Sequence, residues 1–242
     1  MHPGPVNRGV EITDAGMIST DPMLTPAVSE YLESRSAPSA YLLESIFRQT
    51  MLEHSYLDVM LVDSSGALLV SGSDPPLFTG GLPRDLVTTA ADTLTPSFVD
   101  MHLHGGDSVP HMSVIAPLSD DEGRIRVPPA YLVLISDASS FLDPILRPGP
   151  SIGDAVEVAL IEVRGDDVVY LNEPEHSGFS ALELRIPMSD AGQVEAQAAS
   201  GARVCLSGTA YHGGRVLAAA APVQGSPWIL IAMMDEPAAT GG

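Results

Sequence analysis

The chain has 242 residues, which is enough for one large domain or two small ones. It holds 31 acidic and 11 basic residues, a net charge of −20, and every basic residue is an arginine. Because there is no lysine, the sequence excludes a P-loop, the Lys–Glu pair of protein kinases and a Schiff base. The single cysteine, Cys205, excludes an intrachain disulfide and a cysteine-based zinc or iron–sulfur centre. The negative charge argues against binding to nucleic acid or anionic lipid.

Apolar segments are numerous but short. Hydrophobic residues make up 45% of the chain, which predicts a packed core. The longest apolar runs, residues 217–221 and 228–234, fall well below the roughly 20 residues of a membrane-spanning helix. Residues 1–20 lack the apolar core of a signal peptide. These features suit a cytoplasmic protein, and they suit equally a soluble segment of a longer protein.

The first 55 residues predict a leader and a helix. Residues 1–23 are rich in glycine, proline and aspartate, which predicts a flexible leader. Thr25 and Pro26 form a helix start, with a hydroxyl N-cap and a proline in the first turn. Apolar residues continue at helical spacing, so we expect one long N-terminal helix over residues 24–55, with a kink at a second start signal, residues 36–38.

The rest of the chain predicts two similar halves, separated by a Pro/Gly-rich break at residues 147–153. In the first half we expect strands at residues 57–63, 67–71, 97–104, 111–118 and 129–136, and helices at 82–94 and 139–146. In the second half we expect strands at 156–163, 168–171, 181–186, 203–211, 215–222 and 228–235, and a helix at 190–199. Each half is therefore an antiparallel sheet with helices, an α+β unit. We place the two domains at residues 56–148 and 149–236, before a tail at 237–242.

The motif with the most specific spacing is Asp100-x-His102-x-His104, which resembles the metal-binding signature of amidohydrolases. Residues two apart on a strand point the same way, so the three side chains would share one face. His111 would join them across a hairpin. A metal ion held there would activate water for hydrolysis. A metal-dependent, amidohydrolase-like enzyme is therefore the alternative function.

Two simpler interpretations compete with the enzyme. Little more than half of the chain follows the motif, whereas a complete TIM barrel takes about 250 residues. In the first interpretation, the motif residues form the polar face of a strand whose other face carries Val99, Met101 and Leu103. In the second, that polar face lines a ligand pocket. The nucleophile-elbow pattern at residues 149–153 has no strand before it and no helix after it, so it reads as a linker.

Several segments of the second half resemble extracytoplasmic double Cache (PAS-like) sensor domains. They are residues 163–172 (VRGDDVVYLN), 181–187 (ALELRIP), 211–219 (YHGGRVLAA), 222–228 (PVQGSPW) and 229–236 (ILIAMMDE). The first half is similar more loosely, through Ser34-Arg35, Tyr41-Leu42 and residues 59–72 and 131–143, so the likeness extends over residues 24–236. One departure is the Tyr-His-Gly-Gly run at residues 211–214, where the family usually has Tyr-Arg-Gly.

The resemblance implies a long N-terminal helix followed by two tandem PAS-like (Cache) antiparallel-sheet domains. It also implies the extracytoplasmic ligand-sensing domain of a transmembrane receptor, most often a histidine kinase, otherwise a diguanylate cyclase or chemoreceptor. Such a domain has no catalytic activity, cofactor or metal of its own. It binds a small molecule in its membrane-distal half and passes a conformational change across the membrane, in a homodimer. A soluble interaction module without a ligand is the remaining alternative.

We expect the ligand-binding residues on the polar strand face of the membrane-distal half. They are Asp100, His102, His104, His111, Tyr131 and Ser71, with Ser73 beside them. Histidines near their ordinary pKa would alternatively make this half a pH sensor.

Overall fold

The computed structural model describes residues 8–77, 82, 87–88, 95–103, 109–118, 130–139, 142, 146, 156–201 and 205–236. The chain divides into two compact units, Met1–Ala138 and Ser139–Gly242, which we call unit 1 and unit 2. The predicted break at residues 147–153 lies outside the described residues, as do most residues of the helices expected at 82–94 and 139–146.

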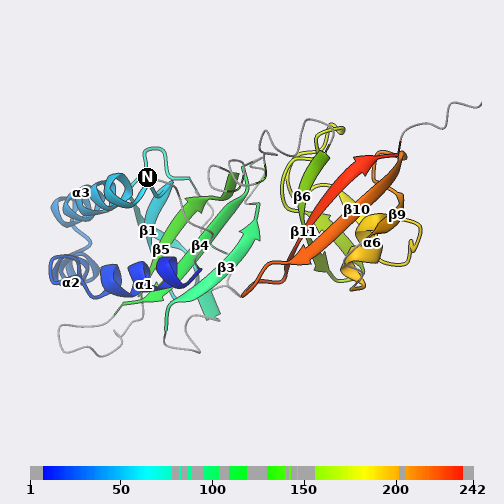
Figure 1. Ribbon diagram of the computed structural model, residues 1–242. Helices are drawn as coiled ribbons and strands as arrows, with labels where there is room; N and C mark the ends of the chain where they lie inside the picture. The colour runs from blue at the N-terminus through cyan, green and yellow to red at the C-terminus, as the bar shows by residue number, and fades with distance from the viewer. Residues whose placement is uncertain are drawn as a thin grey trace, which may run out of the picture. The chain divides into compact units, whose positions relative to one another are not determined.

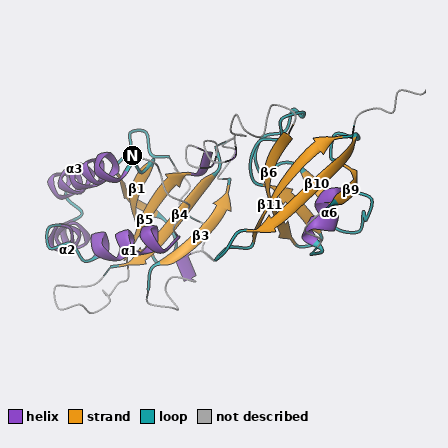
Figure 2. Cartoon of the chain, in the orientation of Figure 1, coloured by secondary structure: helices purple, strands orange, loops and turns teal. Residues whose placement is uncertain are grey.

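Unit 1 combines helices with a five-stranded antiparallel sheet (Figure 1, Figure 2). The helices are α1 (Arg8–Ser19), α2 (Leu24–Ser34) and α3 (Ala37–His54). The strands are β1 (Asp58–Asp63), β2 (Leu68–Ser71), β3 (Ser97–His102), β4 (His111–Pro117) and β5 (Ala130–Asp137). They lie in the order β2-β1-β5-β4-β3, and β3 and β4 form the expected antiparallel pair.

The N-terminal helices differ from their prediction in two ways. Part of the expected leader forms α1, because a small-residue face with Ala15 and Ser19 is buried and the helix contacts β4. The expected long helix is two helices. Arg35 takes a left-handed conformation (φ 50°) that ends α2, and Ser36 caps α3 by accepting a hydrogen bond from the Ser39 N–H. The second start signal therefore begins a new helix and does not merely kink one.

The sheet of unit 1 is buried on both faces. One face packs against α1, α2 and α3, and its buried residues include Val59, Leu61 and Leu132. The other face packs against Leu82 and Val87 of the connection between β2 and β3, and we call it the crossover face. Its buried strand residues are Met60, Val62, Ile115, Tyr131, Val133 and Ile135. Burial on both faces explains why β4 and β5 are almost continuously apolar and do not alternate.

Unit 2 contains a six-stranded antiparallel sheet and the helix α6. Its elements are β6 (Val156–Arg164), β7 (Asp167–Tyr170), β8 (Arg185–Pro187), α6 (Val194–Ala199), β9 (Leu206–Thr209), β10 (Arg215–Pro222) and β11 (Trp228–Asp235). The order is β8-β7-β6-β11-β10-β9. α6, in the connection between β7 and β9, packs Val194 and Ala198 against Ile161 and Ile231. This side of the sheet is therefore the crossover face of unit 2.

Three elements of unit 2 are shorter than the sequence pattern predicts. The strand expected at residues 181–186 is confined to β8, because Leu182 takes a left-handed conformation (φ 69°). The strand expected at 203–211 begins only at Leu206, after Cys205 at φ 55°. The expected helix begins at Val194. Hydrophobicity predicts where a strand is buried, and backbone turns inside the same segment set where its pairing starts.

Both units share one strand connectivity. Leaving out β8, the strands of unit 2 follow the order second, first, fifth, fourth, third, which is the order of unit 1. The expected α+β class with two antiparallel sheets is confirmed. The described strands form no parallel β/α barrel, so the fold gives the metal-hydrolase alternative no support. Across the described part of the chain, no helix is long and apolar enough to cross a bilayer.

Gly72, directly after β2, lies where α3 approaches the sheet most tightly. A Cβ at this position would be 2.7 Å from the Met51 Sδ and 2.9 Å from the Phe47 Cβ. We predict that Gly72→Ala lowers the free energy of unfolding of unit 1 by about 1–3 kcal/mol through overpacking. Urea denaturation followed by far-UV circular dichroism measures this loss. The only tryptophan, Trp228, belongs to unit 2, so the midpoint of its fluorescence transition should stay unchanged.

Gly178→Ala is the matched control for this prediction. No atom lies within 4 Å of the Cβ that alanine would add there. We expect this substitution to change the free energy of unfolding by no more than about 0.5 kcal/mol. Equal losses for both variants would contradict the role of the close α3–sheet contact.

Candidate functional site

A buried carboxylate organises one end of the crossover face of unit 1. Asp58, the first residue of β1, is fully buried. Its carboxylate accepts hydrogen bonds from the hydroxyls of Ser71 (2.8 Å) and Ser73 (2.6 Å). The backbone N–H groups of Ser73 and Leu77 also donate to it, each at 3.2 Å. These donors replace the water that a buried carboxylate loses, and they tie the start of the β2–β3 connection to β1.

Neighbouring strands bring further polar side chains to the same end of the sheet. His111 of β4 lies opposite Asp137 of β5 and opposite His102 of β3. The rings of the two histidines meet edge to face, with 6.4 Å between their centroids. Ser113 lies on β4 two residues after His111. It is opposite Ile135 of β5, which is in turn opposite Asp58 of β1, so Ser113 and Asp58 lie in one row across the sheet. Because alternate strand residues share a face, all of these residues lie on the crossover face.

Burial makes this polar cluster unusual. His111 and Ser113 are each 1% exposed. The Ser113 hydroxyl makes no hydrogen bond within the described part of the chain. Leaving a buried polar group unsatisfied costs about 1–3 kcal/mol, so such groups in native proteins require an explanation. A polar ligand on the crossover face would supply the missing partner.

The residues expected on β3 are arranged differently from the prediction. A β-bulge between Val99 and His102 sets two residues of β3 against one of β4, so His102 shares a face with Val99. The expected strict alternation along this strand is therefore wrong. Asp100 lies within the bulge, where its carboxylate accepts a hydrogen bond from the Met101 N–H (2.8 Å). His104 lies outside the described residues.

Two further expected residues lie at opposite ends of the crossover face. The Ser71 hydroxyl donates to Asp58, so it already serves a structural contact. Tyr131 lies opposite Pro117, six residues along β4 from His111, which corresponds to about 20 Å at 3.3–3.4 Å per residue. The structure thus brings the two described histidines together and places Tyr131 at the opposite end of the sheet.

The sequence pattern did not single out Asp58, Ser113 or Asp137 as site residues. Each of them stands in or directly after an apolar run that predicts a buried strand. A carboxylate or hydroxyl in such a run must find a polar partner, and this was the available signal. The pairing register that joins the three residues is not visible in the sequence.

The first strand of unit 2 also carries a buried carboxylate. Glu157 of β6 accepts hydrogen bonds from the Glu175 N–H (3.0 Å) and from the Tyr211 hydroxyl (2.9 Å). The same hydroxyl accepts from the His176 N–H (2.9 Å). Burial is the main cause that raises the pKa of Tyr211. The His176 N–H lowers this pKa, and the hydrogen bond to Glu157 and the charge of that carboxylate raise it again, so the pKa stays above its ordinary value. Tyr211 therefore remains a neutral phenol that donates to Glu157.

The strand registers place these acids at equivalent positions in the two units. Glu157 lies opposite Met233 of β11, just as Asp58 lies opposite Ile135 of β5. In both units the segment after the second strand donates a backbone N–H to this carboxylate. Two residues further along the final strand, both units carry an aspartate. The equivalent pair is Asp137 and Asp235.

Neither a protein-family model nor a curated protein matches the sequence. Solved structures match its fold. The sensor domain of the histidine kinase DctB from V. cholerae is 8% identical, with a TM-score of 0.54 over 93% of this chain and 88% of that one. The sensory domain of the Campylobacter jejuni chemoreceptor Tlp3 is 14% identical, with a TM-score of 0.56 over 94% and 85%. The ligand-binding domain of the Pseudomonas aeruginosa chemoreceptor PctB, solved with L-Arg, is 13% identical, with a TM-score of 0.52 over 95% and 97%.

These matches extend over nearly all of each chain. The expected likeness to double Cache sensor domains is confirmed at the level of the fold. The matching structures are sensor and ligand-binding domains of histidine kinases and chemoreceptors, and none of them supports the hydrolase alternative.

We predict that Asp58→Ala lowers the free energy of unfolding of unit 1 by about 2–4 kcal/mol, because it leaves the hydroxyl and N–H donors of the β2–β3 connection unsatisfied. Urea denaturation followed by circular dichroism measures the loss, and Trp228 fluorescence again reports unit 2 separately.

Asp63→Ala is the matched control, since Asp63 ends the same strand. Its carboxylate accepts hydrogen bonds from Ser65 and Ala67 in an exposed turn. Burial raises the pKa of Asp63, but these hydrogen bonds outweigh it and hold the pKa below its ordinary value. We expect a loss of no more than about 1 kcal/mol, which disappears as the pH falls through that lowered pKa. A smaller loss for Asp58→Ala than for Asp63→Ala would contradict the prediction.

Proposed function

We propose that this chain is the extracytoplasmic ligand-sensing domain of a transmembrane receptor. The output domain, a histidine kinase or otherwise a diguanylate cyclase or chemoreceptor signalling domain, would belong to another part of the same protein. The observation that carries the proposal is the buried polar cluster on the otherwise apolar crossover face of unit 1. The shared fold supports it, because the matching structures are sensor and ligand-binding domains of such receptors.

The ligand site of this proposal is the end of the crossover face where His102, His111 and Ser113 meet. Imidazole N–H groups suit a carboxylate, the Asp137 carboxylate suits an ammonium group, and the Ser113 hydroxyl both donates and accepts. This combination fits a small zwitterion such as an amino acid. PctB, whose structure was solved with L-Arg, provides a precedent on the same fold. Asp100, in the bulge beside His102, completes the described part of the proposed site. His104 remains a candidate from the sequence alone.

Signal transfer in this proposal uses the packing of unit 1. Ligand binding would favour one arrangement of the crossover face over another. Asp58 of β1 holds the start of the β2–β3 connection, and β1 packs against α3. α3 also exposes Tyr41, Leu42 and Leu52, apolar side chains that a second copy of the chain would cover in the proposed homodimer. A receptor of this kind is anchored in the membrane.

A thermal-shift screen with amino acids, organic acids and amines tests the proposal. A ligand at 100 times its Kd stabilises the folded chain by about 2.7 kcal/mol, which raises the Tm by several degrees. Ser113→Ala should leave the Tm of the free protein unchanged or slightly higher, because the hydroxyl has no partner to lose. The same variant should weaken ligand binding about 2–10-fold, the equivalent of one hydrogen bond.

Ser45→Ala, on the exposed surface of α3, is the control and should keep the full ligand-induced shift. A chain whose Tm responds to no compound at saturating concentration would instead be a spacer or interaction module. A shift that persists in Ser113→Ala, His102→Asn and His111→Asn would place the ligand away from the crossover face of unit 1.

A further inference from the structure

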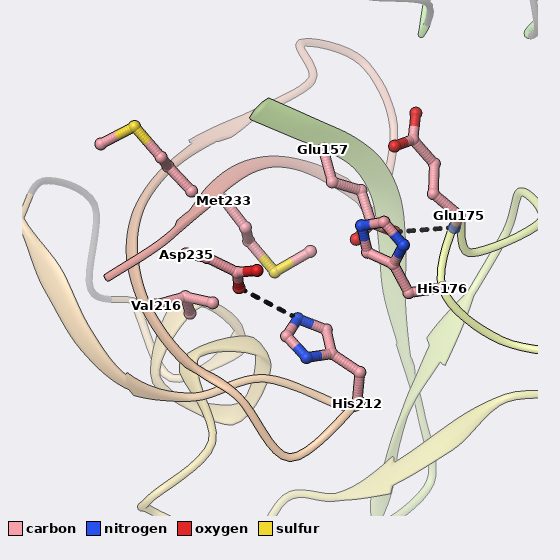
Figure 3. A pocket seen from close by; sticks show the side chains of 8 residues that line it. Glu157, Glu175, His176, His212, Val216, Met233 and Asp235 are labelled. Carbon is pink, nitrogen blue, oxygen red and sulfur yellow. Dashed lines mark hydrogen bonds and ion pairs between the residues drawn. The ribbon is translucent and has the colours of Figure 1, made fainter. Parts of the chain in front are cut away.

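The crossover face of unit 2 ends in a cavity of about 300 Å³ (Figure 3). We propose that this cavity binds a small organic cation, an alkylammonium ion with a short apolar body. The inference concerns unit 2 alone and does not depend on the ligand proposed for unit 1.

The charges that line the cavity favour a cation. Glu157 and Asp235 contribute carboxylates, and the carboxylate of Glu175 points away from them in Figure 3. No arginine is among the described residues that line it. The arginine nearest to it along β10, Arg215, pairs instead with Glu236 (3.2 Å). An anion would therefore meet two carboxylates and no described arginine.

One carboxylate is held in place before any ligand arrives. Glu157 accepts from the Tyr211 hydroxyl and the Glu175 N–H, and its oxygens can accept further hydrogen bonds. Tyr211 is fixed in turn, because its backbone N–H donates to the buried Glu195 (3.0 Å). A carboxylate oriented in this way binds an ammonium group without first losing side-chain entropy.

The second carboxylate is oriented toward the cavity and is incompletely satisfied. The Nδ1 of His212 accepts a hydrogen bond from the Gly214 N–H (3.1 Å), so the proton of the neutral ring is on Nε2. That Nε2 faces the Asp235 Oδ1 at 3.6 Å, which is too long for a good hydrogen bond. The Asp235 side chain is 69% exposed and keeps acceptor capacity for a ligand.

The rest of the wall combines the imidazole of His176 with the apolar side chains of Val216, Met233 and Met234. Val216 and Met233 are buried, 1% and 3% exposed, and they continue the core of unit 2 into the cavity. Methylene groups of a ligand would be buried against them at about 0.8 kcal/mol each. The volume lies at the lower end of small-molecule sites, which limits the occupant to a short chain.

Unit 1 provides an independent observation, because its register repeats the arrangement. Asp58 and Asp137 occupy the positions of Glu157 and Asp235, again on the crossover face and again next to an imidazole, that of His111. A pair of acids therefore occurs twice at equivalent register positions, each time where the crossover face reaches the end of the sheet.

The test compares three probes of one shape by NMR titration of the full chain: n-butylammonium, n-butanol and butyrate. We expect n-butylammonium to bind at least 10-fold more tightly than the other two, with the amide signals of Glu175 and Gly214 moving. Asp235→Asn should weaken n-butylammonium binding at least 5-fold. This isosteric change affects an exposed side chain, so the variant should remain folded.

Asp166→Asn is the matched control, because it removes the same charge from an exposed turn of unit 2 that does not line the cavity. Its affinity for n-butylammonium should stay within twofold of the original. Equal binding of all three probes would overturn the inference, as would unchanged affinity in Asp235→Asn or chemical-shift changes confined to unit 1. Binding of zinc chloride at these residues without any binding of n-butylammonium would also overturn it.

Discussion

The central position of the last strand in each sheet is the constraint on which the site depends. β5 pairs with β1 on one side and with β4 on the other, and β11 pairs in the same way with β6 and β10. Because alternate residues point to opposite faces, one register decides which side chains meet. A slip of one residue would move Asp58 to the side of α1–α3 and bring Val59 to the crossover face. The polar cluster therefore exists only because the apolar residues of β5 fix this register on both faces.

A buried carboxylate on the first strand of each sheet links that strand to the segment after the second strand. An isolated charge there would be costly, so the strand must recruit donors, and it takes them from the segment that follows the second strand. The acid thus holds the start of the segment that runs across the crossover face against the sheet. Histidines complete the arrangement differently in the two units: His111 is part of a strand, whereas His212 precedes β10. The two crossover faces therefore have equivalent acids and distinct surroundings, which allows them to bind different ligands.

Much of this fold could be predicted from the sequence, and its exceptions have physical reasons. Apolar runs bounded by glycine and proline predicted the strands. They also predicted that these strands form two similar halves, one after the other along the chain. α1 was missed because a helix can bury a face of alanine and serine without a hydrophobic stripe. The β3 bulge was missed because one extra residue in a strand leaves no compositional trace. The sequence also does not show that Asp58 and Ser113 lie in one row across the sheet, because their strands are distant in the chain.

Composition and structure both favour a cation in the cavity proposed for unit 2. Every base is an arginine, and those of unit 2 that are described, Arg164, Arg185 and Arg215, pair with acids. Acids outnumber bases by 20 in the whole chain, so carboxylates remain that no arginine neutralises. A surface of this kind attracts cations and repels anions over distances of about a Debye length. For an anion or a zwitterion to bind, the site must supply its own donors, and the imidazoles of unit 1 are suited to that role. The cavity proposed for unit 2 combines the carboxylates of Glu157 and Asp235 with the imidazoles of His176 and His212 and with no described arginine, and we propose an ammonium ion for it.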